Sequence, residues 1–256
     1  MPKSIWNGTI TFGMVSVPIK LYSATESKTV HFREVHAKDG AGIEHRRMCP
    51  KEDREVPYKE IVKGYEVSTA KYVVLEKDEV KAAAGDRGKV IHLDEFVPGG
   101  EIDPVFYDRT YYAGSRDAED AFRLLHAALR KTERAGIGRF SFHDREYLVA
   151  VRAGEDVLVL HTLRFHDEVV SGHDLEMEGR GRKPSEREIS MAGKLVESMG
   201  EDFKPQNYED SYRDAVLDLI KRKAKGEEID LVAQEEPEHG DDLAAALEAS
   251  LGGAGS

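Results

Sequence analysis

The chain has 256 residues, of which 40% are hydrophobic, and this apolar content excludes an intrinsically disordered protein. No long apolar segment opens the sequence, so we expect neither a signal peptide nor a membrane helix, and we expect a cytoplasmic protein. The net charge of -12 argues against a nucleic-acid partner, but nine acidic residues and no Lys or Arg lie between Glu227 and Ser256, which leaves only -3 on the first 226 residues.

The first half of the chain is typical of short β-strands. Between Trp6 and Tyr22 the apolar residues alternate, and their phase changes at Gly13-Met14, which predicts two strands joined by a tight turn or bulge. Further strands are predicted at Lys71–Leu75, Lys89–Leu93, Val105–Tyr112, Gly138–Phe142, Tyr147–Arg152 and Asp156–Phe165. The run Val157 to Leu160 is apolar on both phases, which favours the middle of a sheet. Short strands separated by turn signals indicate an antiparallel barrel or sandwich.

Helical periodicity begins at Asp117 and continues to Arg134, with Gly136 as the expected stop. The capping box Ser185-Glu186-Arg187-Glu188 predicts a second helix that ends at Gly200. A third helix is predicted from Glu209 to Lys225. The organisation expected is a β-rich core over 1–178, a linker and helical arm over 179–226, and an acidic, mostly disordered tail over 227–256 with a short helix over 242–251.

No motif of a common enzyme class occurs in the sequence: there is no P-loop, no dinucleotide fingerprint, no His-Glu-x-x-His and no Gly-x-Ser-x-Gly. The histidines and aspartates from His161 to Asp174 could ligate a metal, but their spacing matches no standard motif, and solvated histidines at a sheet edge are the commoner explanation. The run Phe142 to Glu146 is more typical of a polar hairpin turn than of an acid/base pair. Cys49 is the single cysteine, so no internal disulfide forms; a reactive thiol and a half-buried structural cysteine remain open.

The segment from Lys28 to Lys63 interrupts this pattern and alternates poorly. Long excursions inside a compact domain are usually functional. Nine basic residues meet seven acidic ones here, so composition leaves two alternatives open, a solvated loop and a phosphate-binding segment.

Several runs of the sequence form a characteristic series: Ser4 to Gly13 with Val17 to Tyr22, Glu55 to Tyr58 with Ile61 to Glu66, Tyr72 to Leu75, Glu101 to Tyr107 with Tyr111-Tyr112, and the helical stretch from Met191 to Tyr212. In this order they resemble the bacterial Ku proteins of non-homologous end joining. The resemblance covers about residues 4–226. It implies a mixed β fold with α-helices: a seven- or eight-stranded antiparallel β-barrel core, an inserted bridge at 28–63 that encircles DNA, and a C-terminal helical arm.

This resemblance also implies a homodimer that threads double-stranded DNA ends without reading sequence, at the nucleoid, with no catalytic residue, no metal, no cofactor and no small-molecule substrate. The DNA-binding residues then expected are Arg33, Lys38, Arg46, Arg47, Lys51, Arg54 and Lys63. The dimer-interface residues expected in the arm are Tyr208, Tyr212, Val216 and Leu219, although packing on their own barrel is an alternative.

The end of the chain departs from many family members, because it lacks a Lys-rich extension. The amphipathic Asp242 to Leu251 segment resembles the motif that recruits an ATP-dependent end-joining ligase, through Leu243, Leu247 and Leu251, and a plain disordered tail is the alternative. Two other functions remain open for the whole chain: a metal-dependent nuclease that uses the His161 to Asp174 cluster, and an acidic scaffold that binds proteins and no DNA.

Overall fold

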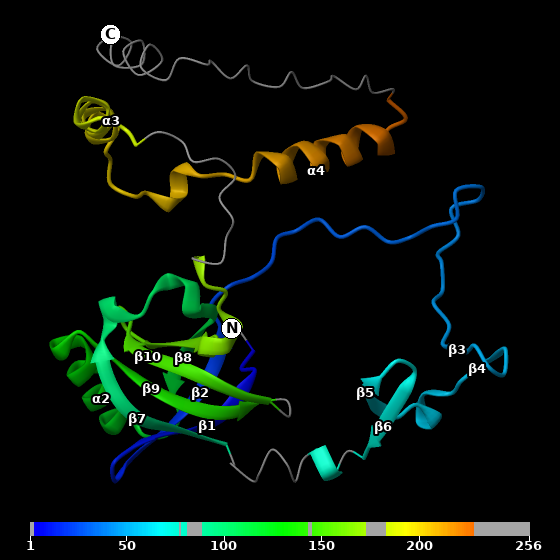
Figure 1. The fold of residues 1–256 in the computed structure, drawn as a ribbon, viewed down its shortest axis with the longest axis horizontal. Coiled ribbons are helices and arrows are strands. Elements are labelled where there is room, and N and C mark those ends of the chain that lie inside the picture. Colours follow the sequence, from blue (N-terminus) through cyan, green and yellow to red (C-terminus); the bar gives the residue numbers. More distant parts are fainter. Residues whose placement is uncertain (1–2, 77, 81–88, 143–144, 173–182, 228–256) are drawn as a thin grey trace. The chain divides into compact units, whose positions relative to one another are not determined.

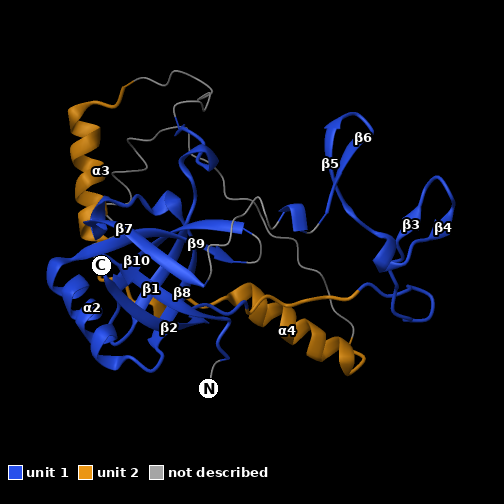
Figure 2. Cartoon of the chain, turned by 90° about the horizontal axis from the view of Figure 1, so that it is seen from below, with its two compact units in different colours: residues 1–27, 34–174 blue, residues 28–33, 175–256 orange. Residues whose placement is uncertain are grey.

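A computed structural model describes residues 3–76, 78–80, 89–142, 145–172 and 183–227 of the chain. The chain divides into two compact units, one formed by residues 1–27 and 34–174 and the other by residues 28–33 and 175–256 (Figure 2). The first unit contains the barrel and most of the excursion, and the second contains two helices. The tail over 228–256, with its expected helix, and most of the expected linker lie outside the described residues.

Seven strands of the first unit close into a barrel (Figure 1). In chain order they are β1 (Trp6–Phe12), β2 (Val15–Ser23), β7 (Val90–Pro98), β8 (Tyr107–Ser115), β9 (Arg134–Phe142), β10 (Arg145–Ala153) and β11 (Leu158–Leu163). Around the barrel their order is β1-β2-β8-β11-β10-β9-β7. The predicted mixed β fold with a barrel core is confirmed.

One pairing in the barrel differs from the antiparallel arrangement that we expected. Strand β1 pairs with β7 in parallel, through Thr9–Val90, Ile10–Ile91 and Thr11–His92, whereas the other neighbours are antiparallel. The reason is geometric: a closed ring with an odd number of strands cannot alternate direction at every step. Seven strands therefore require at least one parallel pair, and the chain places it where it returns from the excursion.

Alternation along the strands builds the core. On β1 and β2 the fully buried residues include Ile10, Val17 and Ile19, which lie on the two phases that the sequence predicts. Leu158 and Leu160 of β11 are also fully buried, between β8 and β10, as the doubly apolar run indicates. Figure 1 shows α2 (Glu119–Thr132) against the barrel, and the helix buries its apolar face of Phe122, Leu125 and Leu129 there.

The expected stop of this helix at Gly136 is wrong. The last helical residue is Thr132, the C-cap Glu133 has a φ of 54° in the left-handed region, and β9 begins at the next residue. Gly136 lies inside β9, where a Cβ would come within 2.8 Å of the Leu93 Cδ1 atom. The glycine is therefore required by close packing in the barrel wall, and the helix ends without one.

The chain leaves the barrel after β2 and re-enters it at β7. In between lie β3 (Met48–Cys49), β4 (Arg54–Glu55), the 3₁₀ turn η1 (Tyr58–Glu60), β5 (Lys63–Ser68) and β6 (Lys71–Leu75). The strands β3 and β4 pair with each other, as do β5 and β6, and neither pair joins the barrel. The strand predicted at Lys71–Leu75 is present, but it belongs to a separate hairpin.

The second unit holds α3 (Glu186–Ser198) and α4 (Ser211–Ala224), joined through the 3₁₀ turn η6 (Pro205–Asn207). The predicted capping box is confirmed: Glu188 N–H donates to the Ser185 Oγ atom, and Ser185 N–H donates to a Glu188 carboxylate oxygen at 2.7 Å. Asp210 caps α4 by accepting from Arg213 N–H. None of the described helices is long and apolar enough to cross a membrane.

Candidate nucleic-acid interface

All seven residues predicted to bind DNA have exposed side chains. Six of them lie in the first unit, along the excursion from Lys38 to Lys63, whereas Arg33 belongs to the second unit. The excursion buries few of its side chains: from Lys51 to Glu76 only Val56 is half-buried, and every other residue is exposed. Cations on such a segment keep their hydration and their reach, as contacts with phosphate require.

Two of these arginines already have carboxylate partners. The guanidinium of Arg46 lies 3.6 Å from Glu44 and 3.7 Å from Glu55. Arg54 pairs with Glu52 and lies 3.4 Å from Glu60. Exposed pairs of this kind contribute about 0–1 kcal/mol each, so a phosphate could displace them at small cost.

Arg47 has a different environment. Its guanidinium carbon lies 5.4 Å from the centroid of the Tyr58 ring, which is the geometry of a cation–π contact. Stacking uses the face of the guanidinium and leaves its N–H edge for a bidentate acceptor such as a phosphate.

Five of the seven predicted residues have no carboxylate partner in the described part of the chain: Arg47, which contacts Tyr58, and Arg33, Lys38, Lys51 and Lys63. They carry the charge that the local acids do not neutralise. The structure therefore separates the predicted set into cations that are already paired and cations that remain available.

The histidines of the excursion are engaged locally. His45 lies 2.9 Å from Glu34, and His36 lies 3.0 Å from Asp39. The Ala41 N–H and His36 bond the Asp39 carboxylate and lower the pKa of Asp39. These contacts close a turn that displays Lys38, and they occupy carboxylates that could otherwise neutralise it.

The β5–β6 hairpin exposes apolar side chains on both faces. Tyr65 pairs across the strands with Val73 and Gly64 with Val74, and the side chains of Tyr65, Val73 and Val74 are 68%, 48% and 55% exposed. Sequence reasoning missed β5, although the alternation of Tyr65 and Val67 was a signal. An isolated two-stranded hairpin is at best marginally stable in water, so this one needs a covering surface.

The arm residues predicted at a dimer interface are not buried within the described chain. Tyr208 and Tyr212 are 74% and 75% exposed, and Val216 and Leu219 are half-buried on α4. Tyr208 stacks on Phe203 with 5.7 Å between ring centroids. The residues predicted to recruit a ligase, Leu243, Leu247 and Leu251, lie outside the described residues.

His161 is not arranged as a metal ligand. Its Nε2 accepts from Arg152 Nε–H at 3.0 Å, and its Nδ1 lies 3.0 Å from the Thr110 Oγ1 atom. Burial, with the charge of Arg152, lowers the pKa of His161 to about 4. Within the described ranges no group of three potential ligands lies together, and His173 and Asp174 fall outside those ranges. The geometry therefore does not favour the nuclease alternative.

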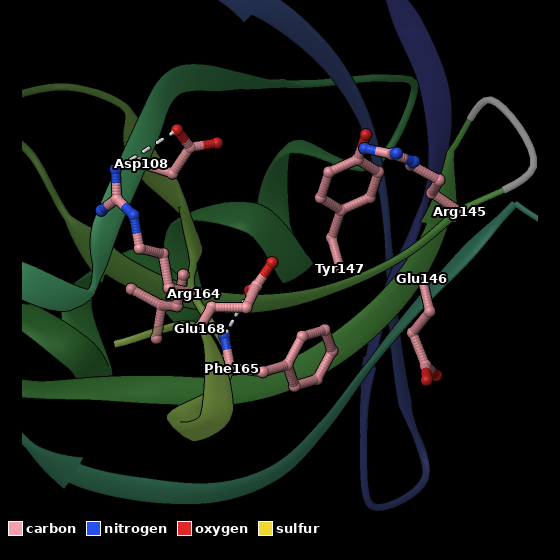
Figure 3. Close-up of a pocket in the computed structure, with 8 residues that line it drawn as sticks. Asp108, Arg145, Glu146, Tyr147, Arg164, Phe165 and Glu168 are labelled. Atoms are coloured by element: carbon pink, nitrogen blue, oxygen red, sulfur yellow. Dashed lines mark hydrogen bonds and ion pairs between the residues drawn. The ribbon is translucent and has the colours of Figure 1, made fainter. Parts of the chain in front are cut away.

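A cavity of about 530 Å³ at the barrel carries charges of both signs (Figure 3). Asp108 lies 3.8 Å from Arg164, and a Glu168 oxygen accepts from Phe165 N–H at 2.7 Å. Figure 3 shows Glu146 and Tyr147 pointing to opposite sides of β10. Three carboxylates, those of Asp108, Glu146 and Glu168, outnumber the two arginines that line the cavity, so it is a poor site for an anion.

Together these features define a β-barrel protein with a long exposed insertion that carries unneutralised cations. The family model described as Ku70/Ku80 beta-barrel domain matches residues 11–191. The chain is 42% identical to the non-homologous end joining protein Ku of Anaeromyxobacter sp. (strain K), over 99% of this chain and 86% of that protein. It is 38% identical to Ku 1 of Geotalea uraniireducens (strain Rf4), over 96% and 95%, and 33% identical to Ku of Bacillus subtilis (strain 168), over 97% and 81%. The chain belongs to the Ku family.

A solved structure, the SPOC domain of human PHD-finger protein 3, covers 63% of this chain and 95% of its own at 12% identity, with a TM-score of 0.30. This likeness is too weak to carry an argument.

Proposed function

We propose that this protein is a homodimeric clamp that binds the ends of double-stranded DNA in non-homologous end joining. The observation that carries the proposal is the exposed excursion whose Lys38, Lys51 and Lys63 have no carboxylate partner among the described residues, in a chain of the Ku family. Phosphate contacts from such cations do not depend on base sequence. Selection of an end then follows from threading the duplex through a ring, and no bond chemistry, metal or cofactor is required.

A second copy of the chain is the proposed cover for the β5–β6 hairpin. Both faces of this hairpin expose apolar side chains, and no third strand joins it in the part of the chain that the structure describes. The arm residues Tyr208, Tyr212, Val216 and Leu219 are the proposed second contact with the partner. The proposed ring needs contacts between two copies of the chain, because the excursion of a single copy would not enclose a duplex.

The dimer is tested by replacing Tyr65 and Val73 with Ser, and separately Tyr212 and Val216 with Ser, followed by sedimentation. We expect the first pair to shift the protein towards monomer and to reduce end binding, because it removes apolar area from the hairpin. Tyr112 is exposed on the barrel strand β8, so Tyr112→Ser is the matched control. A dimer of unchanged strength in the hairpin and arm variants would contradict this arrangement.

The C-terminal tail is proposed to recruit the ATP-dependent end-joining ligase through Leu243, Leu247 and Leu251. Nine acidic charges in this tail repel DNA and leave a short apolar segment for a protein. Replacing Leu247 with Asp should abolish stimulation of the ligase on linear DNA while end binding is retained. Loss of end binding in the same variant would assign the tail a different role.

The clamp itself is tested by comparing a closed circular duplex with the same molecule after linearisation. We expect binding to the linear form that weakens steeply with salt, and little binding to the circle at moderate salt. Equal affinity for both forms would refute threading. Absence of binding to either form would favour the acidic scaffold.

A further inference from the structure

The barrel has a second cavity, of about 760 Å³, at the place where the chain leaves it for the excursion. Ser23 and Thr25, the last residue of β2 and its near neighbour, line this cavity. Lys3, Ile5, Arg109 and Tyr111 contribute to its wall from other parts of the barrel. Its volume is in the range that accepts small ligands and single residues of a polymer.

The charges of this cavity have one sign. Lys3 and Arg109 line it, and none of the described lining residues is a carboxylate. Arg109 is only loosely paired, because its Nε lies 4.0 Å from Asp108 and the same carboxylate lies 3.8 Å from Arg164 and accepts from the Thr162 hydroxyl at 3.3 Å. The guanidinium of Arg109 is therefore able to bind an anion, in contrast to the mixed-charge cavity of Figure 3.

The remaining wall combines aromatic rings with hydroxyl groups. Tyr111 and Phe142 both line the cavity, and Phe142 is held against Phe140 by ring stacking, with 6.1 Å between centroids and 20° between planes. Thr110 also lines it. Because Arg152 donates to the Nε2 of His161, the Nδ1 carries the proton and donates to Thr110, which leaves the Thr110 hydroxyl proton for a ligand.

We infer that this cavity binds an unpaired nucleotide at a DNA end, with its phosphate on Lys3 and Arg109 and its base against Tyr111 and Phe142. Cations and aromatic rings without carboxylates are the side chains that proteins use for single-stranded nucleic acid. An unpaired end also differs from duplex in having bases that can leave the stack. The inference rests on the proposed end binding and adds a preference for ends that carry an overhang.

The test compares a blunt duplex with duplexes that carry a short 5′ or 3′ single-stranded overhang. We expect the full-length protein to bind one of the overhangs about fivefold more tightly or better than the blunt end, since stacking of one base contributes at least that factor. Changing Lys3 and Arg109 together to Gln should remove this gain and leave blunt-end affinity unchanged. A matched variant, Arg123→Gln with Lys131→Gln on the exposed face of α2, removes the same charge and should keep the gain.

Other outcomes overturn the inference and leave the clamp intact. Equal affinity for blunt and overhanging ends, with the circle still excluded, would refute the nucleotide site alone. Loss of the gain in the α2 variant would show that bulk charge causes it. A free deoxynucleotide monophosphate is the last probe: saturable binding that Lys3→Gln with Arg109→Gln abolishes, without any overhang preference, would assign the cavity to a free nucleotide and not to DNA.

Discussion

Three lysines that have no carboxylate partner among the described residues allow a quantitative prediction of the salt dependence of binding. Lys38, Lys51 and Lys63 are exposed, and each phosphate contact that such a cation makes releases counterions from duplex DNA. Each contact contributes about 0.9 to the slope of log affinity against log salt concentration. Changing all three lysines to Gln should therefore reduce the slope for a linear blunt duplex by about 2.7.

The measurement is a titration of labelled linear duplex by fluorescence anisotropy at several salt concentrations. The matched control changes Lys89, Arg123 and Lys131 to Gln, which removes the same net charge from exposed positions outside the excursion. We expect the slope of the control to stay close to that of the unmodified protein. An unchanged slope in the excursion variant, or an equal reduction in both variants, would refute the assignment of these lysines to phosphate.

Three predictions concern the barrel. Gly138→Ala should lower the free energy of unfolding, measured with urea, by about 3 kcal/mol, because the added Cβ would lie 2.0 Å from the His92 carbonyl oxygen. Gly100→Ala is the control and should change this free energy little, because no atom lies within 4 Å of its added Cβ. Glu133→Gly should raise the free energy of unfolding by about 0.5–1 kcal/mol, because the φ of 54° at this residue lies in the left-handed region that glycine adopts without strain. An unchanged urea midpoint would contradict this prediction. The pKa of His161 is lowered to about 4 in the folded protein, so between about pH 6.5 and pH 4 the unfolded chain binds more protons and stability falls as the pH drops. His161→Gln should lose this part of the pH dependence of the urea midpoint. Parallel pH profiles for the variant and the unmodified protein would refute this prediction.

Much of the barrel could be predicted because alternation is a local signal. The phase change at Gly13-Met14 gives β1 and β2, and the doubly apolar run to Leu160 gives a strand with neighbours on both sides. Closure is different. The parallel pairing of β1 with β7 joins segments about eighty residues apart, and it follows from the number of strands rather than from any short run of residues.

The helix stop predicted at Gly136 is wrong because glycine can be required at a position for two different physical reasons. A glycine after a helical stretch usually ends the helix, so the sequence predicts a stop at Gly136. In the structure it makes room for Leu93 and Phe96 within β9, and Glu133 accepts the left-handed conformation instead. The sequence does not show which neighbour lies across a strand, so it cannot separate these two uses of glycine.

The sequence predicts the candidate DNA interface only as a set of cations. Which of them are neutralised depends on contacts between segments of the excursion: Arg46 pairs with Glu55 of β4, and Arg54 pairs with Glu60 of η1. The cavity that contains Lys3 and Arg109 had no signal in the sequence, because its residues come from four separate segments of the barrel.

The sorting of charges within the excursion explains how an acidic chain can bind DNA. Nine basic and seven acidic residues between Lys28 and Lys63 almost cancel, yet several acids are paired with Arg46, Arg54, His36 and His45. Among the described residues, Lys38, Lys51 and Lys63 therefore keep no carboxylate partner. At about 0.1 M salt, charges more than about 10 Å apart are largely screened, so any carboxylate of the acidic tail beyond that distance from the DNA opposes the contact only weakly. Binding of this kind depends on short-range contacts and gains little from long-range attraction. The proposed clamp would tolerate this slower capture, because enclosure of the threaded duplex, and not long-range electrostatic attraction, would limit its dissociation.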